Sequence, residues 1–104
     1  MDIVFTSTGQ LRVERAQEFN SLRTLAPEDT NSSEMSRLAG PAGYATECAS
    51  GDVFWVSRDW LRQQVGSSPA DRARLEAMFT YAEEKGWIGQ NGEIRSHIEW
   101  TTVD

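Results

Sequence analysis

The sequence predicts one small α+β domain, in which two or three helices pack on a mostly antiparallel sheet. The chain has 104 residues, which suffices for one modest hydrophobic core. Aromatic residues make up 10% of the chain and include four Trp, a content too high for a disordered protein. Short apolar runs typical of strands alternate with helical patterns that have clear starts and stops, and this mixture favours the α+β class.

The N-terminal part of the chain predicts a strand and then an ambiguous segment. Residues 3–5 are apolar and predict a short strand. Residues 10–26 fit a helical stripe, in which apolar side chains recur every three or four positions. The alternative is a hairpin that turns at residues 8–9. Because that hairpin would place Ile3 of the strand opposite Glu14, the helix is favoured.

Residues 27–43 predict a mobile loop within the single domain of residues 1–104. The segment holds two Pro and two Gly, and one helical turn is compatible with residues 34–39. A loop of this length in so small a domain is typically functional or disordered.

The second half of the chain carries clearer signals. A run of four apolar residues at 53–56 predicts a central strand that is buried on both faces. Ser57 and Ser68 are good N-caps, and Gly86 is a left-handed helix stop. The Asn91-Gly92 pair predicts a type I′ hairpin turn before a half-buried last strand. The elements expected from these signals are strands at 44–49, 53–56, 87–90 and 93–101 and helices at 58–65 and 69–85.

The charge balance disfavours nucleic acid and membrane surfaces as general partners. The chain carries 16 acidic and 10 basic residues, for a net charge of −6 at pH 7. Residues 53–75 differ from the rest, because they contain four Arg and two Asp. We call these four arginines the basic cluster; they are Arg58, Arg62, Arg72 and Arg74.

Cysteine usage and hydropathy predict a cytoplasmic protein that does not contact the membrane. The single cysteine cannot form an intramolecular disulfide, which excludes a disulfide-stapled secreted scaffold. The N-terminal residues lack the basic and apolar regions of a signal peptide, and no apolar run is long enough for a membrane span.

Few residues in the sequence are suited to catalysis or to metal binding. His97 is the only His and Cys48 is the only Cys, whereas structural zinc usually needs four ligands. Glycine-rich phosphate-binding and dinucleotide-binding motifs are absent. We therefore expect no metal, no cofactor and no enzymatic activity. A small enzyme that uses Cys48 or His97 is the third functional hypothesis.

From residue 53 onward, the predicted elements are a strand, two helices, and two strands joined by a turn. This order resembles a winged-helix DNA-binding module over about half the chain. The resemblance implies that Arg72 and Arg74 on the longer helix face DNA and that Asn91-Gly92 forms the tip of the wing. The acidic net charge speaks against it, because a phosphate-binding surface needs several cations on one face.

The first hypothesis is a small, soluble, non-enzymatic binding or regulatory module that acts through contacts with another protein. The candidate surface joins the loop at 27–43 to one tryptophan and the basic cluster. Its partner-binding residues would be Arg58, Trp60, Arg62, Arg72 and Arg74. A winged-helix-like DNA-binding regulator is the second hypothesis.

Overall fold

The computed structural model describes residues 1–6, 8–16, 18–19, 21–47, 51–65, 67–89 and 91–101. The strands are β1 (Asp2–Phe5), β2 (Leu11–Glu14), β3 (Arg23–Pro27), β4 (Gly43–Thr46), β5 (Val53–Val56) and β6 (Ile94–Thr101). The helices are α1 (Ser32–Ala39), α2 (Arg58–Val65) and α3 (Pro69–Lys85), with a short 3-10 helix η1 (Gly40–Ala42). Three helices on a six-stranded, mostly antiparallel sheet confirm the predicted α+β class. None of the described helices has the length and apolar character needed to cross a membrane.

The six strands form one mixed sheet in the order β2-β1-β3-β6-β5-β4. Antiparallel pairing joins β1 to β2, β4 to β5 and β5 to β6, whereas β3 runs parallel to both of its neighbours, β1 and β6. The strand that the winged-helix resemblance places in a wing is therefore an interior strand of the sheet, hydrogen-bonded on both sides.

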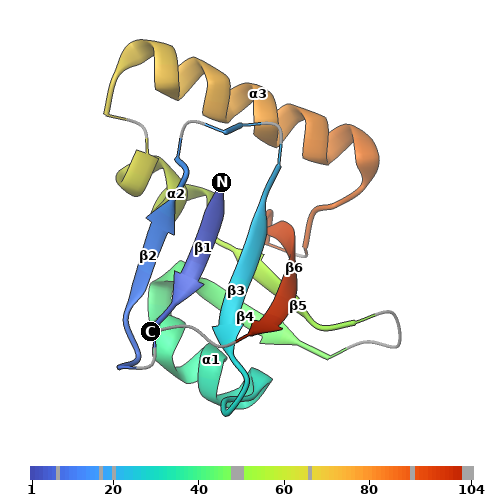
Figure 1. The fold of residues 1–104 in the computed structure, drawn as a ribbon. Helices are drawn as coiled ribbons and strands as arrows, with labels where there is room; N and C mark the ends of the chain where they lie inside the picture. The colour runs from blue at the N-terminus through green and yellow to red at the C-terminus, as the bar shows by residue number, and fades with distance from the viewer. Residues whose placement is uncertain are drawn as a thin grey trace.

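The sheet curls around its own core. Phe5 of β1 and Phe54 of β5 meet edge to face with ring centroids 5.2 Å apart, although β3 and β6 lie between their strands. In a flat sheet these two strands would be roughly 14 Å apart. Figure 1 shows α3 across one end of the curled sheet and α1 at the opposite end. The enclosed core consists of Met1, Ile3, Phe5, Ala26, Met35, Ala39, Ala42, Phe54, Val56, Leu61, Val65, Leu75, Phe79, Ala82, Ile94 and Ile98.

The helix boundaries predicted for the second half are confirmed by their capping contacts. The hydroxyls of Ser57 and Ser68 accept hydrogen bonds of 3.2 Å from backbone N–H groups in the first turns of α2 and α3. Gly86 adopts the left-handed conformation, with φ of 76°. The N–H of Trp87 then donates to the carbonyl of Ala82 at 2.9 Å, which is the hydrogen bond of a Schellman stop.

Burial along β5 and β6 also follows the prediction. In β5, Val53, Phe54 and Val56 are buried. In β6, buried and exposed residues alternate from Ile94 to Glu99, so one face of this strand packs on the core and the other faces water.

The helix predicted at residues 10–26 is wrong, because the segment contains β2 and the start of β3. The hairpin alternative differs from the structure by one residue in register. Ile3 pairs with Val13; in the connection between the strands, the N–H of Thr6 donates to the carbonyl of Gln10 at 2.8 Å, and Gly9 has φ of 83°. A shift of one residue moves every side chain of a strand to the other face. In the observed register, apolar residues of β2 therefore meet apolar residues of β1.

The type I′ turn predicted at Asn91-Gly92 is also wrong, because the observed pairing differs from the predicted pairing by one residue. The N–H of Gly89 donates to the carbonyl of Glu93 at 2.8 Å, whereas a two-residue turn at 91–92 would pair residue 90 with Glu93. Gly92 has φ of 82°. Among the described residues other than glycine, only Arg15 has a positive φ, so the φ of Asn91 is not positive. Asn91 therefore lacks the conformation that a type I′ turn requires at both central positions.

The predicted loop at residues 27–43 contains α1 and η1. The side chain of Asn31 caps α1 by accepting a hydrogen bond of 2.9 Å from the N–H of Glu34. Mobility of this segment stays a prediction. The strand expected at 44–49 is observed as β4, which ends at Thr46. The hypothesis about Cys48 falls outside the described residues.

Candidate functional site

Three of the four arginines in the basic cluster form ion pairs within the helices. Arg58 lies 2.8 Å from a carboxylate oxygen of Glu83. Arg62 donates to both oxygens of Glu76, at 2.8 and 2.9 Å. The Nε atom of Arg72 lies 3.7 Å from the same carboxylate. Much of the positive charge that the sequence gathers at this place is thus compensated by α3 itself.

Arg62 is the best-anchored member of the basic cluster. It also donates to Asp59 at 2.7 Å, and its guanidinium lies 5.2 Å above the ring centroid of Phe79. The hydrogen bonds to Glu76 raise the pKa of Arg62, and those from Arg62 lower the pKa of Glu76. These contacts join α2 to α3, which gives Arg62 a structural role.

The structure separates the other two predicted partner-binding residues from this network. Trp60 is partly buried and packs against the core. Arg74 lies two residues beyond Arg72 on α3, which places the two side chains on opposite faces of the helix. Arg74 lines a groove on that face. A partner-binding role for the predicted set stays a prediction.

A groove with a volume of about 590 Å³ lies beside α3, and we call it the α3 groove. One wall comes from α3, the opposite wall comes from the segment between β2 and β3, and Trp87 and the start of β6 complete the lining. The volume is in the range of ligand-binding pockets. The lining residues are Phe19, Ser21, Leu22, Arg74, Ala77, Met78, Tyr81, Ala82, Trp87, Ile94 and Arg95.

The wall opposite α3 is held in place by the first residue of the chain. The terminal ammonium group of Met1 donates to the carbonyls of Glu18 and Ser21, at 2.9 and 3.0 Å. Burial lowers the pKa of this ammonium group. Phe19 and Leu22 are partly buried against the core, so they offer a supported apolar surface to the groove.

Two aromatic side chains are exposed at the α3 groove. Tyr81 is 52% exposed and Trp87 is 41% exposed. Among the residues that the structure describes, no other large hydrophobic side chain is classed as exposed. Their rings meet edge to face with centroids 5.8 Å apart. The helix stop at Gly86 directs the chain so that Trp87 returns to the last turn of α3.

The charged residues of the α3 groove are all basic. Arg74 and Arg95 line it, and none of the described lining residues carries a carboxylate. The ammonium group of Lys85 lies 5.5 Å from the ring centroid of Tyr81, which is favourable for a cation near an aromatic face. Within the described ranges, none of these three cations forms an ion pair.

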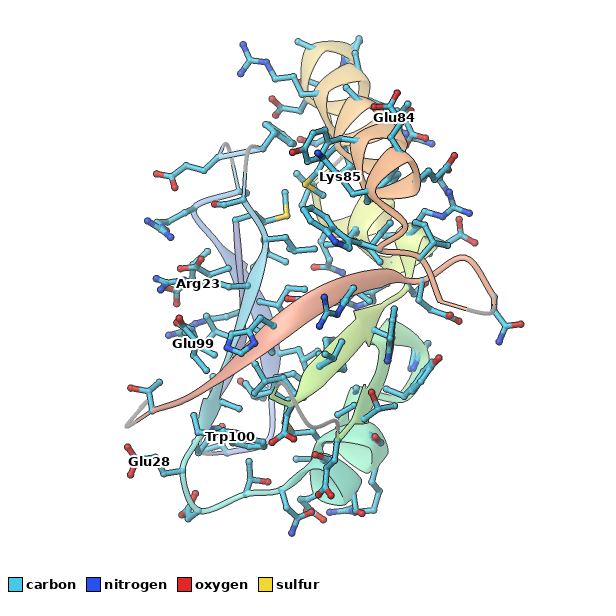
Figure 2. All side chains as sticks on the ribbon, turned by 90° about the vertical axis from the view of Figure 1, so that its right-hand side faces the viewer. Arg23, Glu28, Glu84, Lys85, Glu99 and Trp100 are labelled. Carbon is cyan, nitrogen blue, oxygen red and sulfur yellow. The ribbon has the colours of Figure 1, made fainter. Side chains whose placement is uncertain are left out.

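The face of the sheet that points away from the core carries a network of charged side chains with a structural role. The carboxylate of Asp2 accepts hydrogen bonds from Arg15 and Arg23, and Arg23 also donates to Glu99 at 3.0 Å. Figure 2 shows Arg23 and Glu99 side by side on this face. His97 is exposed on the same strand, and no group of three metal-ligating side chains occurs in the described part of the chain.

A second hollow, of about 320 Å³, is mainly polar and contains Asp29 and Glu34. Arg37 forms an ion pair with Glu34 and lowers the pKa of that carboxyl group. One of the two charges is thus compensated within α1. The α3 groove is the stronger candidate, because it exposes apolar surface that a partner could cover.

Sequence reasoning missed the α3 groove, although one of its walls was visible. Arg74, Ala77, Met78 and Tyr81 have the spacing i, i+3, i+4, i+7, which places them on one face of a helix. The opposite wall could not be foreseen, because residues 18–22 were assigned to a helix.

Comparisons of the chain with protein-family models, with curated proteins and with solved structures found no match. The functional argument therefore rests on the geometry and chemistry of the α3 groove.

Proposed function

We propose that the protein is a binding module that holds apolar side chains of a partner protein in the α3 groove. The observation that carries this proposal is the exposure of Tyr81 and Trp87 at a groove whose lining is mainly apolar. Contiguous apolar surface of this kind commonly marks a site of protein interaction. Aromatic residues are also enriched at the centres of interfaces, where they contribute most of the binding energy.

The lining of the α3 groove favours binding over catalysis. Its described residues include no Cys, His, Asp or Glu, which are the residue types that most often serve as nucleophile or general acid and base. The basic cluster supports a binding surface less well, because Arg58, Arg62 and Arg72 are already ion-paired.

A photocrosslinking amino acid in place of Tyr81 tests the proposal. The matched control places the same amino acid at Thr80, which is also exposed on α3 but does not line the α3 groove. In cells that produce the protein naturally, we expect an adduct at position 81 that is absent at position 80. The captured partner, identified and purified, should then bind the unmodified protein in solution.

Two neutral substitutions test whether that binding uses the α3 groove. Ala77 and Ala73 are both exposed on α3, but only Ala77 lines the groove. We expect Ala77→Gln to weaken binding about fivefold or more and Ala73→Gln to leave it unchanged, because only the first places a polar side chain at the contact. The same adducts at positions 80 and 81, or binding that Ala77→Gln does not weaken, would overturn the proposal.

A further inference from the structure

The shape of the α3 groove indicates the conformation of its occupant. Arg74, Ala77, Met78 and Tyr81 span two turns of α3, or roughly 10 Å. Their side chains form one wall, and those of Phe19 and Leu22 contribute to the other. A helix that lies beside α3 would present apolar residues with the same i, i+3, i+4, i+7 spacing to both walls.

An extended peptide is less suited to this place. Binding by strand addition requires a free strand edge with unpaired backbone groups. The strand residues at the groove are Ile94 and Arg95 of β6, which pair with β5 on one side. On the other side, Ile94 forms a β-bridge with Ile88, and the N–H of Arg95 donates to the carbonyl of Trp87 at 3.0 Å. The residue just before the strand is likewise occupied, because the N–H of Gly89 donates to the carbonyl of Glu93. The α3 groove therefore offers side chains rather than a backbone edge.

The charges at the α3 groove indicate the chemistry of the flanking residues. Arg74 and Arg95 line it with no carboxylate among the lining residues that the structure describes, and Lys85 lies against Tyr81 at its margin. These cations belong to a chain whose net charge is −6, and elsewhere many of its arginines are paired with acidic residues. Carboxylates of a partner would complement the groove, whereas a basic partner would be repelled locally.

We infer, on the basis of the proposed function, that the α3 groove binds an amphipathic helix whose apolar face is flanked by Asp or Glu residues. The apolar face would cover Tyr81, Met78 and Trp87, and the carboxylates would lie near Arg74 and Arg95. Single-stranded nucleic acid also combines stacking surfaces with negative charge. It fits less well, because Leu22, Met78 and Ile94 give the groove an aliphatic lining and a phosphate backbone needs more cations than the three present.

A displayed library of random peptides of about 15 residues, roughly four helical turns, tests the inference. The library is selected on the full chain, and binders that also bind the Ala77→Gln variant are removed. This substitution carries no charge, so the counter-selection does not favour acidic or basic peptides. We expect the enriched peptides to be helical, with apolar residues at i, i+3 or i+4 and i+7 and with acidic residues beside them.

Charge reversal then tests where the acidic residues lie. Arg74→Glu and Arg95→Glu should each weaken an enriched peptide about two- to fivefold at low salt, as expected for exposed ion pairs. Changing the matching acidic residue of the peptide to Lys should restore binding. The control is Arg72→Glu, which makes the same charge change on the opposite face of α3 and should have no effect on binding.

The outcomes separate the two proposals. Groove-dependent peptides that are neutral or basic, or that bind as extended chains, would overturn the acidic helix and leave the proposed function intact. A selection that yields no groove-dependent peptide would count against the proposed function itself. Binding of a fluorescent oligothymidine that is lost in Trp87→Ala would show a nucleic-acid site and overturn the inference.

Discussion

Arg62 and Glu76 form a two-point ion pair that joins α2 to α3, with nitrogen–oxygen distances of 2.8 and 2.9 Å. Sequence reasoning assigned Arg62 to a partner surface, whereas its guanidinium is held between a carboxylate and the ring of Phe79. The member of the basic cluster that lines the α3 groove is Arg74, on the face of α3 opposite to Arg72.

The first prediction concerns this ion pair. We expect Glu76→Gln to lower the free energy of unfolding at pH 7 by about 0.5–1.5 kcal/mol, because it removes a charge-assisted contact that is partly exposed. The folded protein lowers the pKa of Glu76 below its ordinary value of 4.5. The contribution is therefore present above that value and is lost as the pH falls through the lower folded-state pKa.

Urea unfolding of both proteins at pH 7 and pH 3 measures this difference. The difference in the free energy of unfolding between Glu76→Gln and the unmodified protein should be smaller at pH 3 than at pH 7. Glu84→Gln is the control, because Glu84 is exposed on α3 and forms no ion pair among the described residues. A gap that is equal at both pH values would contradict the assignment of the effect to the carboxylate.

The second prediction concerns Asp2, whose side chain is only 6% exposed beneath Arg15 and Arg23. Burial alone would raise the pKa of Asp2, but hydrogen bonds from the two arginines outweigh it and the pKa is lowered from 3.8. We expect Asp2→Asn to lower the free energy of unfolding by about 1–3 kcal/mol at pH 7. This difference should fade as the pH drops below about 4.

Chemical denaturation tests the second prediction. It is carried out at pH values from about 2.5 to about 7, so that the series covers the titration of a carboxylate. The control is Glu99→Gln, which removes the exposed carboxylate that Arg23 also contacts. That change should cost less than about 1 kcal/mol, as exposed ion pairs do. Equal costs for the two substitutions would show that burial of Asp2 does not strengthen its contacts.

The third prediction contrasts two glycines with positive φ. A Cβ atom at Gly43, where φ is 151°, would lie 2.0 Å from the carbonyl oxygen of Trp55. The same atom at Gly86 would meet nothing within 4 Å. We expect Gly86→Ala to cost about 1–2 kcal/mol, the price of the left-handed conformation alone, and Gly43→Ala to cost more than twice as much.

Thermal unfolding followed by circular dichroism compares the two variants. The melting temperature should fall clearly further for Gly43→Ala, because backbone of β4 and β5 must separate to admit the methyl group. Similar melting temperatures would mean that these strands do not pack as closely as the structure shows.

The fourth prediction concerns the buried hydroxyl groups of Thr24 and Ser96, which are 2.8 Å apart between β3 and β6. Both residues are fully buried. We expect Thr24→Val to destabilise the protein by about 1–3 kcal/mol, because the hydroxyl of Ser96 loses its partner away from water. Thr24→Val combined with Ser96→Ala should cost less than the sum of the single changes. Additive costs in this double-mutant cycle would refute the coupling.

The fold was most predictable where its signals are local. Ser68 and Gly86 specify the ends of α3 through contacts within a few residues, so the sequence pattern alone locates them. By contrast, Thr24 of β3 pairs with Ile98 of β6, far along the chain. The apolar spacing of residues 10–26 is compatible with a helix, and only the distant partner strand decides in favour of β structure.

The candidate site was less predictable than the fold, because it requires contacts between distant segments. The exposure of Tyr81 depends on where the segment that carries Phe19 packs, and the sequence does not reveal this. Arginine content alone suggested the basic cluster. Whether an arginine is free or paired depends on neighbours such as Glu76, which lies 14 residues from Arg62 in the chain.

The position of β6 also bears on how the chain is synthesised. β6 is the bridge between the β2-β1-β3 and β5-β4 parts of the sheet, yet it is the last of the six strands to leave the ribosome. Until it emerges, β3 and β5 each present an open hydrogen-bonding edge, and the two parts have no strand to join them. The complete sheet therefore cannot form before β6 has been synthesised. Strand edges that stay open until then are places where a nascent chain is prone to pair with other chains.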